Sequence, residues 1–132
     1  MNKICCIFHD AKNEKDINLY KLKTVIRYGY AYVDKNGEHI HNLHTWDDGS
    51  RILKKCNECG AYVLVQFSEF HNMSNGEDID YSDYFAVESP EQAKKLNKMY
   101  DGFKLEFEYK APRLKYRNGK YQGANYLYMI DE

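Results

Sequence analysis

The chain has 132 residues, of which 19 are Lys or Arg and 20 are Asp or Glu, for a formal net charge of −1. This length predicts a single domain over residues 1–132 that can bury a core without disulfides, and the balanced charge gives no bulk attraction to nucleic acid or membrane. No stretch approaches the roughly 18 apolar residues of a membrane span, and the first apolar run is too short for a signal peptide. We therefore expect a cytoplasmic protein whose thiols stay reduced.

The first part of the chain has the pattern of short strands. Residues 3–8 are mostly apolar and predict a strand, and residues 19–33 place tyrosines at a period of two, which predicts a longer one. The Asn-Gly pair within residues 34–37 is typical of a hairpin turn, because both residues readily take positive φ. The chain is expected to return through residues 39–41 and to turn again at residues 47–49.

The middle of the chain is expected to hold two strands around a short cysteine motif. Residues 51–55 lead into Cys56–Cys59, and residues 61–70 lead out of it with an apolar run. Residues 71–83 are polar and acidic and are interpreted as a loop, followed by a short strand at residues 84–87.

A helix is predicted over residues 89–101. Ser89 is a favourable N-cap, Pro90 suits the first helical position, and Gln92 follows Ser89 by three residues, as in a capping box. One face of this helix would carry Ala93, Leu96, Asn97 and Tyr100. Gly102 is expected to end it.

The last part of the chain again indicates strands. Residues 103–110 alternate apolar and charged side chains, which predicts a half-buried strand. Residues 117–120 contain a second Asn-Gly turn, and residues 126–130 predict a final strand. One main helix among about seven strands gives an α+β fold on a largely antiparallel sheet.

The motif with defined chemistry is Cys56-x-x-Cys59, followed by Gly60. Two thiolates at this spacing can both face one Zn²⁺, and a glycine after them lets backbone amides turn toward the sulfurs. A loop of this form between two strands resembles the zinc knuckle of zinc-ribbon proteins. The resemblance implies a structural zinc ion with four ligands.

The other two ligands are expected from the N-terminus. Cys6 and His9 have C-x₂-H spacing, as in a second knuckle with histidine in place of one cysteine, and Cys5 is the alternative to Cys6. The pair of knuckles resembles a zinc ribbon that carries a long insertion. The expected metal ligands are therefore Cys6, His9, Cys56 and Cys59. The histidines that remain as rival donors are His39, His41, His44 and His71.

The first functional hypothesis is a non-enzymatic protein-binding module, such as a toxin-immunity protein or a phage or mobile-element inhibitor of host defence. Acidic side chains between residues 69 and 83 suit a basic partner; they are Glu69, Glu77, Asp78, Asp80 and Asp83. With its CxxCG motif at residues 56–60, the whole chain resembles small uncharacterised proteins of low-GC Gram-positive bacteria and their mobile elements. That resemblance implies a bacterial cytoplasm, or a host cytoplasm if a phage encodes the protein.

The second hypothesis is nucleic-acid binding by a hairpin near the C-terminus, where lysines and arginines alternate with rings that bases can stack on. The candidate contacts are Lys110, Arg113, Lys115, Tyr116, Arg117, Lys120 and Tyr121.

The third hypothesis is a metal-dependent hydrolase with Glu69 or Asp47 as base. No HExxH, GxSxG or P-loop motif is present, and cysteine-rich metal sites normally serve structure, so we do not expect an enzyme. A redox role for the CxxC motif fits less well, because Gly60 and a β-branched run follow it in place of a helix.

Overall fold

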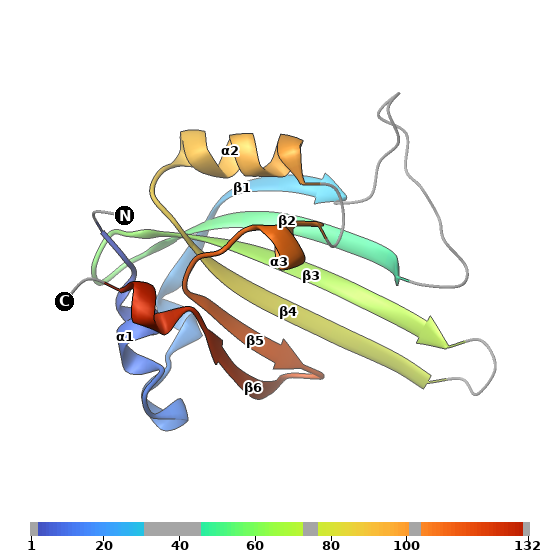
Figure 1. Ribbon diagram of the computed structural model, residues 1–132, viewed down its shortest axis with the longest axis horizontal. Helices are drawn as coiled ribbons and strands as arrows, with labels where there is room; N and C mark the ends of the chain where they lie inside the picture. Colours follow the sequence, from blue (N-terminus) through green and yellow to red (C-terminus); the bar gives the residue numbers. More distant parts are fainter. Residues whose placement is uncertain (1–2, 31–45, 73–76, 101–103, 131–132) are drawn as a thin grey trace.

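The computed structural model describes residues 3–30, 46–72, 77–100 and 104–130. Its centre is an antiparallel sheet of six strands in which each strand pairs with the next along the chain (Figure 1). The strands are β1 (Leu22–Tyr30), β2 (Trp46–Cys56), β3 (Tyr62–Asn72), β4 (Glu77–Val87), β5 (Arg113–Arg117) and β6 (Lys120–Asn125). The short helices are α1 (Cys6–Asp10), α2 (Pro90–Met99) and α3 (Lys104–Glu108), with 3-10 turns η1 (Glu14–Asp16), η2 (Leu19–Lys21) and η3 (Leu127–Met129).

Strand β3 lies at the middle of the sheet and is covered on both faces. Its residues Val63, Leu64 and Val65 are all fully buried. Side chains along a strand alternate between the two faces, so three consecutive buried residues require a core on each side. The unbroken apolar run after the cysteine motif reflects this double burial.

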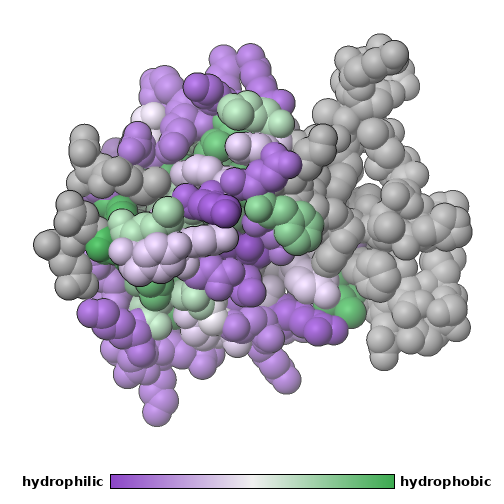
Figure 2. Space-filling model, viewed as in Figure 1, coloured by the Kyte–Doolittle hydropathy of each residue, from purple (hydrophilic) through white to green (hydrophobic). Residues whose placement is uncertain are grey.

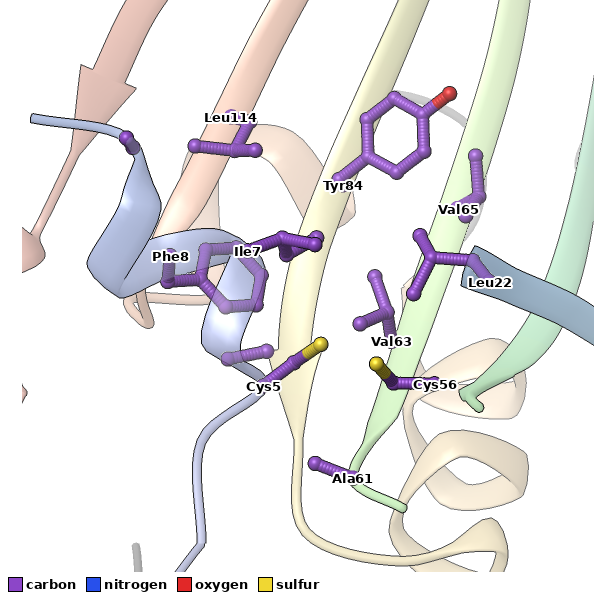
Figure 3. Packing of buried hydrophobic residues seen from close by; sticks show 12 residues of the cluster. Cys5, Ile7, Phe8, Leu22, Cys56, Ala61, Val63, Val65, Tyr84 and Leu114 are labelled. Carbon is purple, nitrogen blue, oxygen red and sulfur yellow. The ribbon is translucent and has the colours of Figure 1, made fainter. Parts of the chain in front are cut away.

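The first core packs the N-terminal segment against the sheet. Ile7 and Phe8 of α1 lie beside Val63 and Leu114, and Figure 3 shows this packing close to the sulfur atoms of two cysteines. η3 lies at the same end of the molecule as α1 (Figure 1), and its Leu127 packs on this core. Burial of each large apolar side chain contributes about 1.5–3 kcal/mol, so this core holds the N-terminal segment in place.

The second core packs α2 and α3 on the opposite face, where the buried members are Leu53, Leu64, Phe85, Val87, Ala93, Leu96 and Leu105. Buried arginines tie each helix to this face. Arg51 is 1% exposed and donates from Nε to Gln66 at 2.8 Å and from Nη1 to the Asn97 carbonyl of α2 at 3.2 Å.

The second arginine, Arg113 of β5, joins two carboxylates from different elements. Its Nη2 lies 2.6 Å from Asp83 of β4 and 2.6 Å from Glu106 of α3. Both Arg113 and Asp83 are buried, so this ion pair replaces hydration that the groups lose on folding. It therefore holds α3 on the sheet.

Several sequence predictions agree with the structure. Strands flank the cysteine motif, and Asn118 (φ 52°) and Gly119 (φ 77°) form the turn between β5 and β6. Ser89 caps α2 by accepting a hydrogen bond from the Gln92 amide at 3.1 Å, and Pro90 is its first residue. In the part of the chain that the structure describes, α2 is one of three short α-helices, so the expectation of one main helix is not confirmed.

The predicted strand at residues 3–8 is wrong, and the predicted loop at residues 71–83 is wrong for residues 71–72 and 77–83, while residues 73–76 lie outside the described residues. Cys6 to Asp10 form α1, because one helical turn brings both Ile7 and Phe8 onto the core. Most of the acidic segment belongs to β4, which pairs with β3 at every position from Asn72↔Glu77 to Tyr62↔Val87. An unbroken ladder of backbone hydrogen bonds outweighs the low strand propensity of its acidic residues.

The C-terminal strands were also assigned incorrectly. Residues 104–108 form α3, in which Leu105 is buried, Phe107 is exposed, and the Tyr109 amide donates to the Leu105 carbonyl at 3.0 Å. Residues 127–129 form η3 after Tyr126, whose φ of 61° ends the extended chain. The predicted turn at residues 47–49 lies within β2, where the register shifts between Trp46 and Asp48.

The predicted turn at residues 34–37 and the return at 39–41 lie outside the described residues. None of the helices that the structure describes has the length and apolar character needed to cross a membrane.

We predict that replacing Arg113 by methionine lowers the free energy of unfolding by about 3–5 kcal/mol, because it leaves the buried Asp83 carboxylate without its cation. Urea unfolding measures this change. The matched control is Lys120→Met at the exposed hairpin turn, for which a change within about 0.5 kcal/mol is expected. Equal effects of the two substitutions would contradict the role given to Arg113.

Candidate metal centre

Four cysteine side chains converge where the N-terminal segment meets the turn between β2 and β3. The sulfur atoms of Cys5, Cys6, Cys56 and Cys59 all lie within 4.8 Å of one another. The Cys6–Cys56 and Cys5–Cys59 pairs are each 3.8 Å apart. Figure 3 shows the sulfurs of Cys5 and Cys56 directed into the same space.

The turn after β2 fixes the second pair of cysteines. Cys56 is the last residue of β2, its amide donates to the Ala61 carbonyl at 2.9 Å, and the Gly60 amide donates back to the Cys56 carbonyl at 2.9 Å. Gly60 has a φ of 75°, which side chains other than glycine rarely adopt. This tight turn directs Cys59 back toward Cys56, as expected from the sequence.

The start of α1 fixes the first pair. Cys5 is the N-cap of α1, with φ −57° and ψ 141°, and Cys6 is the first helical residue. The change from extended to helical backbone between these neighbours lets both side chains approach the turn after β2. Cys5 is fully buried and Cys6 partly buried.

The structure brings together three of the four expected ligands, Cys6, Cys56 and Cys59, and adds Cys5 to them. His9 is not in this group. It lies in the last turn of α1, three residues after Cys6 and so about 4.5 Å farther along the helix axis. From the sequence we expected Cys5 only as a replacement for Cys6. The presence of two adjacent cysteines was the signal that both could be ligands.

Of the four rival histidines, the structure describes only the backbone of His71. His39, His41 and His44 lie outside the described residues. The backbone of His71 pairs with Asp78 near the far end of β3, nine residues from Tyr62 and therefore roughly 30 Å from the cysteine turn.

The spacing of the sulfurs fits a tetrahedral metal ion. Four sulfurs at about 2.3 Å from a central Zn²⁺ would be about 3.8 Å from each other. The Cys6–Cys56 and Cys5–Cys59 sulfur pairs have this separation, and all four sulfurs lie within 4.8 Å of one another. The four residues that would hold the ion are thus already close to the geometry that it requires.

The electrostatics of the cluster also favour a cation. Burial raises the pKa of Cys5 and, most strongly among several causes, that of Cys6. Burial acts in the same direction on Cys59, but hydrogen bonds from the Ala61 and Cys6 amides and from the neighbouring thiols lower the pKa of Cys59 to about 7. Four thiolates repel one another in this space, so their joint ionisation requires a bound cation.

Lys21 supplies positive charge at the edge of the cluster. The Lys21 side chain is 12% exposed, and its ammonium group lies 3.0 Å from Glu58 and 3.3 Å from Asp10. Burial raises the pKa of Cys6, and the hydrogen bond from Lys21 acts in the opposite direction. The Lys21 carbonyl also accepts a hydrogen bond from the Asn57 amide at 2.7 Å. Lys21 therefore connects α1, the start of β1 and the cysteine turn.

The predicted basic hairpin does not form one surface. Arg113 is buried against Asp83 and Glu106, while Tyr116 is half-buried and packs edge-on against Tyr84 at 5.5 Å. Tyr121 packs against Tyr116 at 5.4 Å. The remaining members are Lys110, Lys115, Arg117 and Lys120, of which Lys110, Arg117 and Lys120 are exposed.

The acidic residues are also divided. Asp83 is buried and bonded to Arg113, so it is not available to a partner. Glu69 and Asp80 are exposed and directly opposite each other on β3 and β4, and the backbone of Asp48 on β2 pairs with Glu69. The backbones of Glu77 and Asp78 lie farther along β4 in the same direction.

Comparisons of the chain with protein-family models, curated proteins and solved structures find no match.

We predict that serine at any of the four cysteine positions lowers the affinity for Zn²⁺ by more than about 100-fold. Replacing a residue that only contacts a metal ligand already lowers metal affinity about 10- to 100-fold, and loss of a ligand has a larger effect. Competition with a chromophoric chelator measures the affinity. His9→Ala is the matched control and is expected to keep the wild-type value. If Cys5→Ser keeps it and His9→Ala loses it, the ligand set drawn from the structure is wrong.

We further predict that Lys21→Met lowers the affinity for Zn²⁺ about 10- to 100-fold, whereas Lys21→Arg, which keeps the charge, stays within a few-fold of wild type. The same competition assay applies. Asp10→Asn and Glu58→Gln remove the carboxylate partners of Lys21 but leave its contact with Cys6, so both should bind zinc nearly normally. A loss in these two variants as large as that in Lys21→Met would mean that Lys21 acts through its ion pairs alone.

Proposed function

We propose that this protein is a small non-enzymatic module, stabilised by a structural Zn²⁺ on Cys5, Cys6, Cys56 and Cys59, that acts by binding another protein. A toxin-immunity protein or a phage or mobile-element inhibitor of host defence is a function of this kind. The observation that carries the proposal is the convergence of four thiols from two distant parts of the chain.

The donor set favours zinc over the common hard cations. Thiolates are soft ligands that select zinc, copper(I) or iron–sulfur clusters, whereas magnesium and calcium take oxygen ligands. A tetrahedral set of four sulfurs with a CxxC turn is typical of structural zinc.

The same donor set argues against catalysis at the metal. A catalytic zinc keeps one position open for water or substrate, whereas four cysteines occupy all four tetrahedral positions. The metal would instead link α1 to the turn between β2 and β3, and so set the position of the N-terminal segment on the sheet.

The end of the sheet opposite the metal centre suits a basic protein partner. Glu69 and Asp80 are exposed and lie directly opposite each other on β3 and β4, and we call them the acidic row. Exposed carboxylates next to each other give electrostatic complementarity to a positively charged partner. On the face seen in Figure 2, hydrophobic residues form several separate patches among hydrophilic ones, which fits recognition through polar contacts.

We predict that a tagged chain isolated from its native cells retains at least one basic protein at a stoichiometric ratio, and that Glu69→Gln/Asp80→Asn reduces this retention about 10-fold or more. Quantitative mass spectrometry of the two samples measures the difference. Glu91→Gln/Glu108→Gln removes two exposed carboxylates elsewhere and is the matched control. An identical set of retained proteins in all three samples would contradict the role of the acidic row.

A further inference from the structure

An open hollow of about 760 Å³ lies between the segment that follows α1 and the sheet. Residues between Glu14 and Tyr20, in η1 and at the start of η2, line one side of it. Lys54 of β2, Tyr84 of β4 and Tyr116 of β5 line the other side. Small-molecule sites in proteins have volumes of about 300–1,000 Å³, so the hollow is large enough for a small ligand.

The sheet residues of the hollow share one face of the sheet. Lys54 is directly opposite Val63, and Tyr84 is directly opposite Val65. Directly opposite residues of antiparallel strands lie on the same face, and both valines belong with Tyr84 to the first core (Figure 3). Tyr116 packs edge-on against Tyr84, with 5.5 Å between the ring centroids. The hollow therefore combines one ammonium group with two tyrosine rings on a single surface.

Two short turns fix the other side of the hollow. The Asn13 side chain accepts a hydrogen bond from the Lys15 amide at 3.2 Å, and the Asn18 side chain accepts one from the Tyr20 amide at 3.0 Å. Ile17, between these turns, packs on the first core. The Tyr20 side chain lines the hollow and is 90% exposed, so its ring can contact a ligand.

Lys54 is a half-buried cation at this hollow, and none of the ion pairs between described residues involves it. Arg27 lies opposite Ile52 on the same face and adds further positive charge nearby. Lysines protect the edge strands of sheets, but Lys54 lies on β2, which is paired on both sides. An anion in the hollow would replace hydration that this ammonium group loses on folding.

The charged side chains that line the hollow have a net charge of one positive unit. Lys15 and Lys54 are cations, and Glu14 is a carboxylate. A ligand with one negative charge would therefore neutralise the hollow. The three tyrosine rings favour an aromatic ligand, because aromatic rings attract one another in stacked and edge-to-face arrangements.

We propose that this hollow binds a small molecule that combines one aromatic ring with a single anionic group, a carboxylate or a phosphate. The anionic group would pair with Lys54, and the ring would pack against Tyr20 and Tyr84. A ligand without negative charge would not satisfy Lys54, and one without a ring would leave the tyrosine rings uncovered. This binding goes beyond the proposed function and does not depend on the metal.

Titration with phenylacetate and with phenyl phosphate, followed by the NMR shifts of backbone amides, tests the proposal on the full chain as purified. We expect saturable shifts at residues that line the hollow, with a dissociation constant below about 10 mM. The two probes carry the same ring on a carboxylate or a phosphate, so the one that binds more tightly identifies the anionic group. Acetate and inorganic phosphate lack the ring and benzyl alcohol lacks the charge, so each should bind at least about 5-fold more weakly.

Lys54→Met should weaken binding of the tighter aromatic probe about 10-fold, because a hydrogen bond to a charged group is lost. The matched control is Lys55→Met, which removes the next lysine on the opposite face, across from Tyr62, and should stay within about 2-fold of wild type. Tyr20→Ala should weaken binding about 2- to 12-fold. Tyr128→Ala removes a ring that is 81% exposed elsewhere and should have no effect.

Melting temperature shows whether a loss of binding reflects misfolding. Lys54→Met should melt no lower than wild type, because an apolar side chain replaces a half-buried charge. The proposal is overturned if neither aromatic probe binds saturably, if Lys54→Met and Lys55→Met bind equally, or if acetate or benzyl alcohol binds as tightly as phenylacetate. Shifts confined to residues away from the hollow would also overturn it.

Discussion

The position of α1 on the sheet depends on a contact between four thiols, two from the start of α1 and two from the turn after β2. α1 has only five residues, too few to be stable without tertiary contacts. Ile7 and Phe8 bury it against the sheet, and the adjacent cysteines bring its first turn within reach of Cys56 and Cys59. An ion bound there would lock the helix to the sheet, and its binding free energy would add to the free energy of folding. The contact of Lys21 with the cluster would offset part of the negative charge of the thiolates.

A second constraint acts on the opposite face. Arg51 and Arg113 fix α2 and α3 to the sheet through buried hydrogen bonds, so both faces are covered by short helices that could not fold alone. The two ends of the sheet therefore carry side chains of different charge. Positive side chains lie near the cysteine turn, and the exposed carboxylates of Glu69 and Asp80 lie toward the far ends of β3 and β4. The net charge is a sum over both ends of the sheet, so it does not show this separation. For this reason composition alone argued against charged partners.

Three features could be predicted from the sequence because they depend on neighbouring residues only. They are the hairpin at Asn118 and Gly119, the Ser89 cap of α2 and the strands around the cysteine motif. The wrong secondary-structure predictions lie where contacts between distant parts of the chain outweigh the local sequence pattern. The alternation at residues 103–110 suggested a strand, but Leu105 and Tyr109 are also one helical turn apart, and Arg113 holds the resulting helix through Glu106. At the cysteine cluster, Cys6, Cys56 and Cys59 were predicted from the sequence. That Cys5 joins this cluster and His9 does not depends on the backbone conformation at the start of α1. Residue spacing alone does not show this conformation.

The most direct test of this account is thermal unfolding of the purified protein with and without a strong chelator, on samples whose metal content has been measured. We expect one equivalent of zinc per chain and a fall of about 10 °C or more when it is removed, since the metal binds only the folded form. A sample that holds no transition metal and has the same melting curve in both conditions would contradict it.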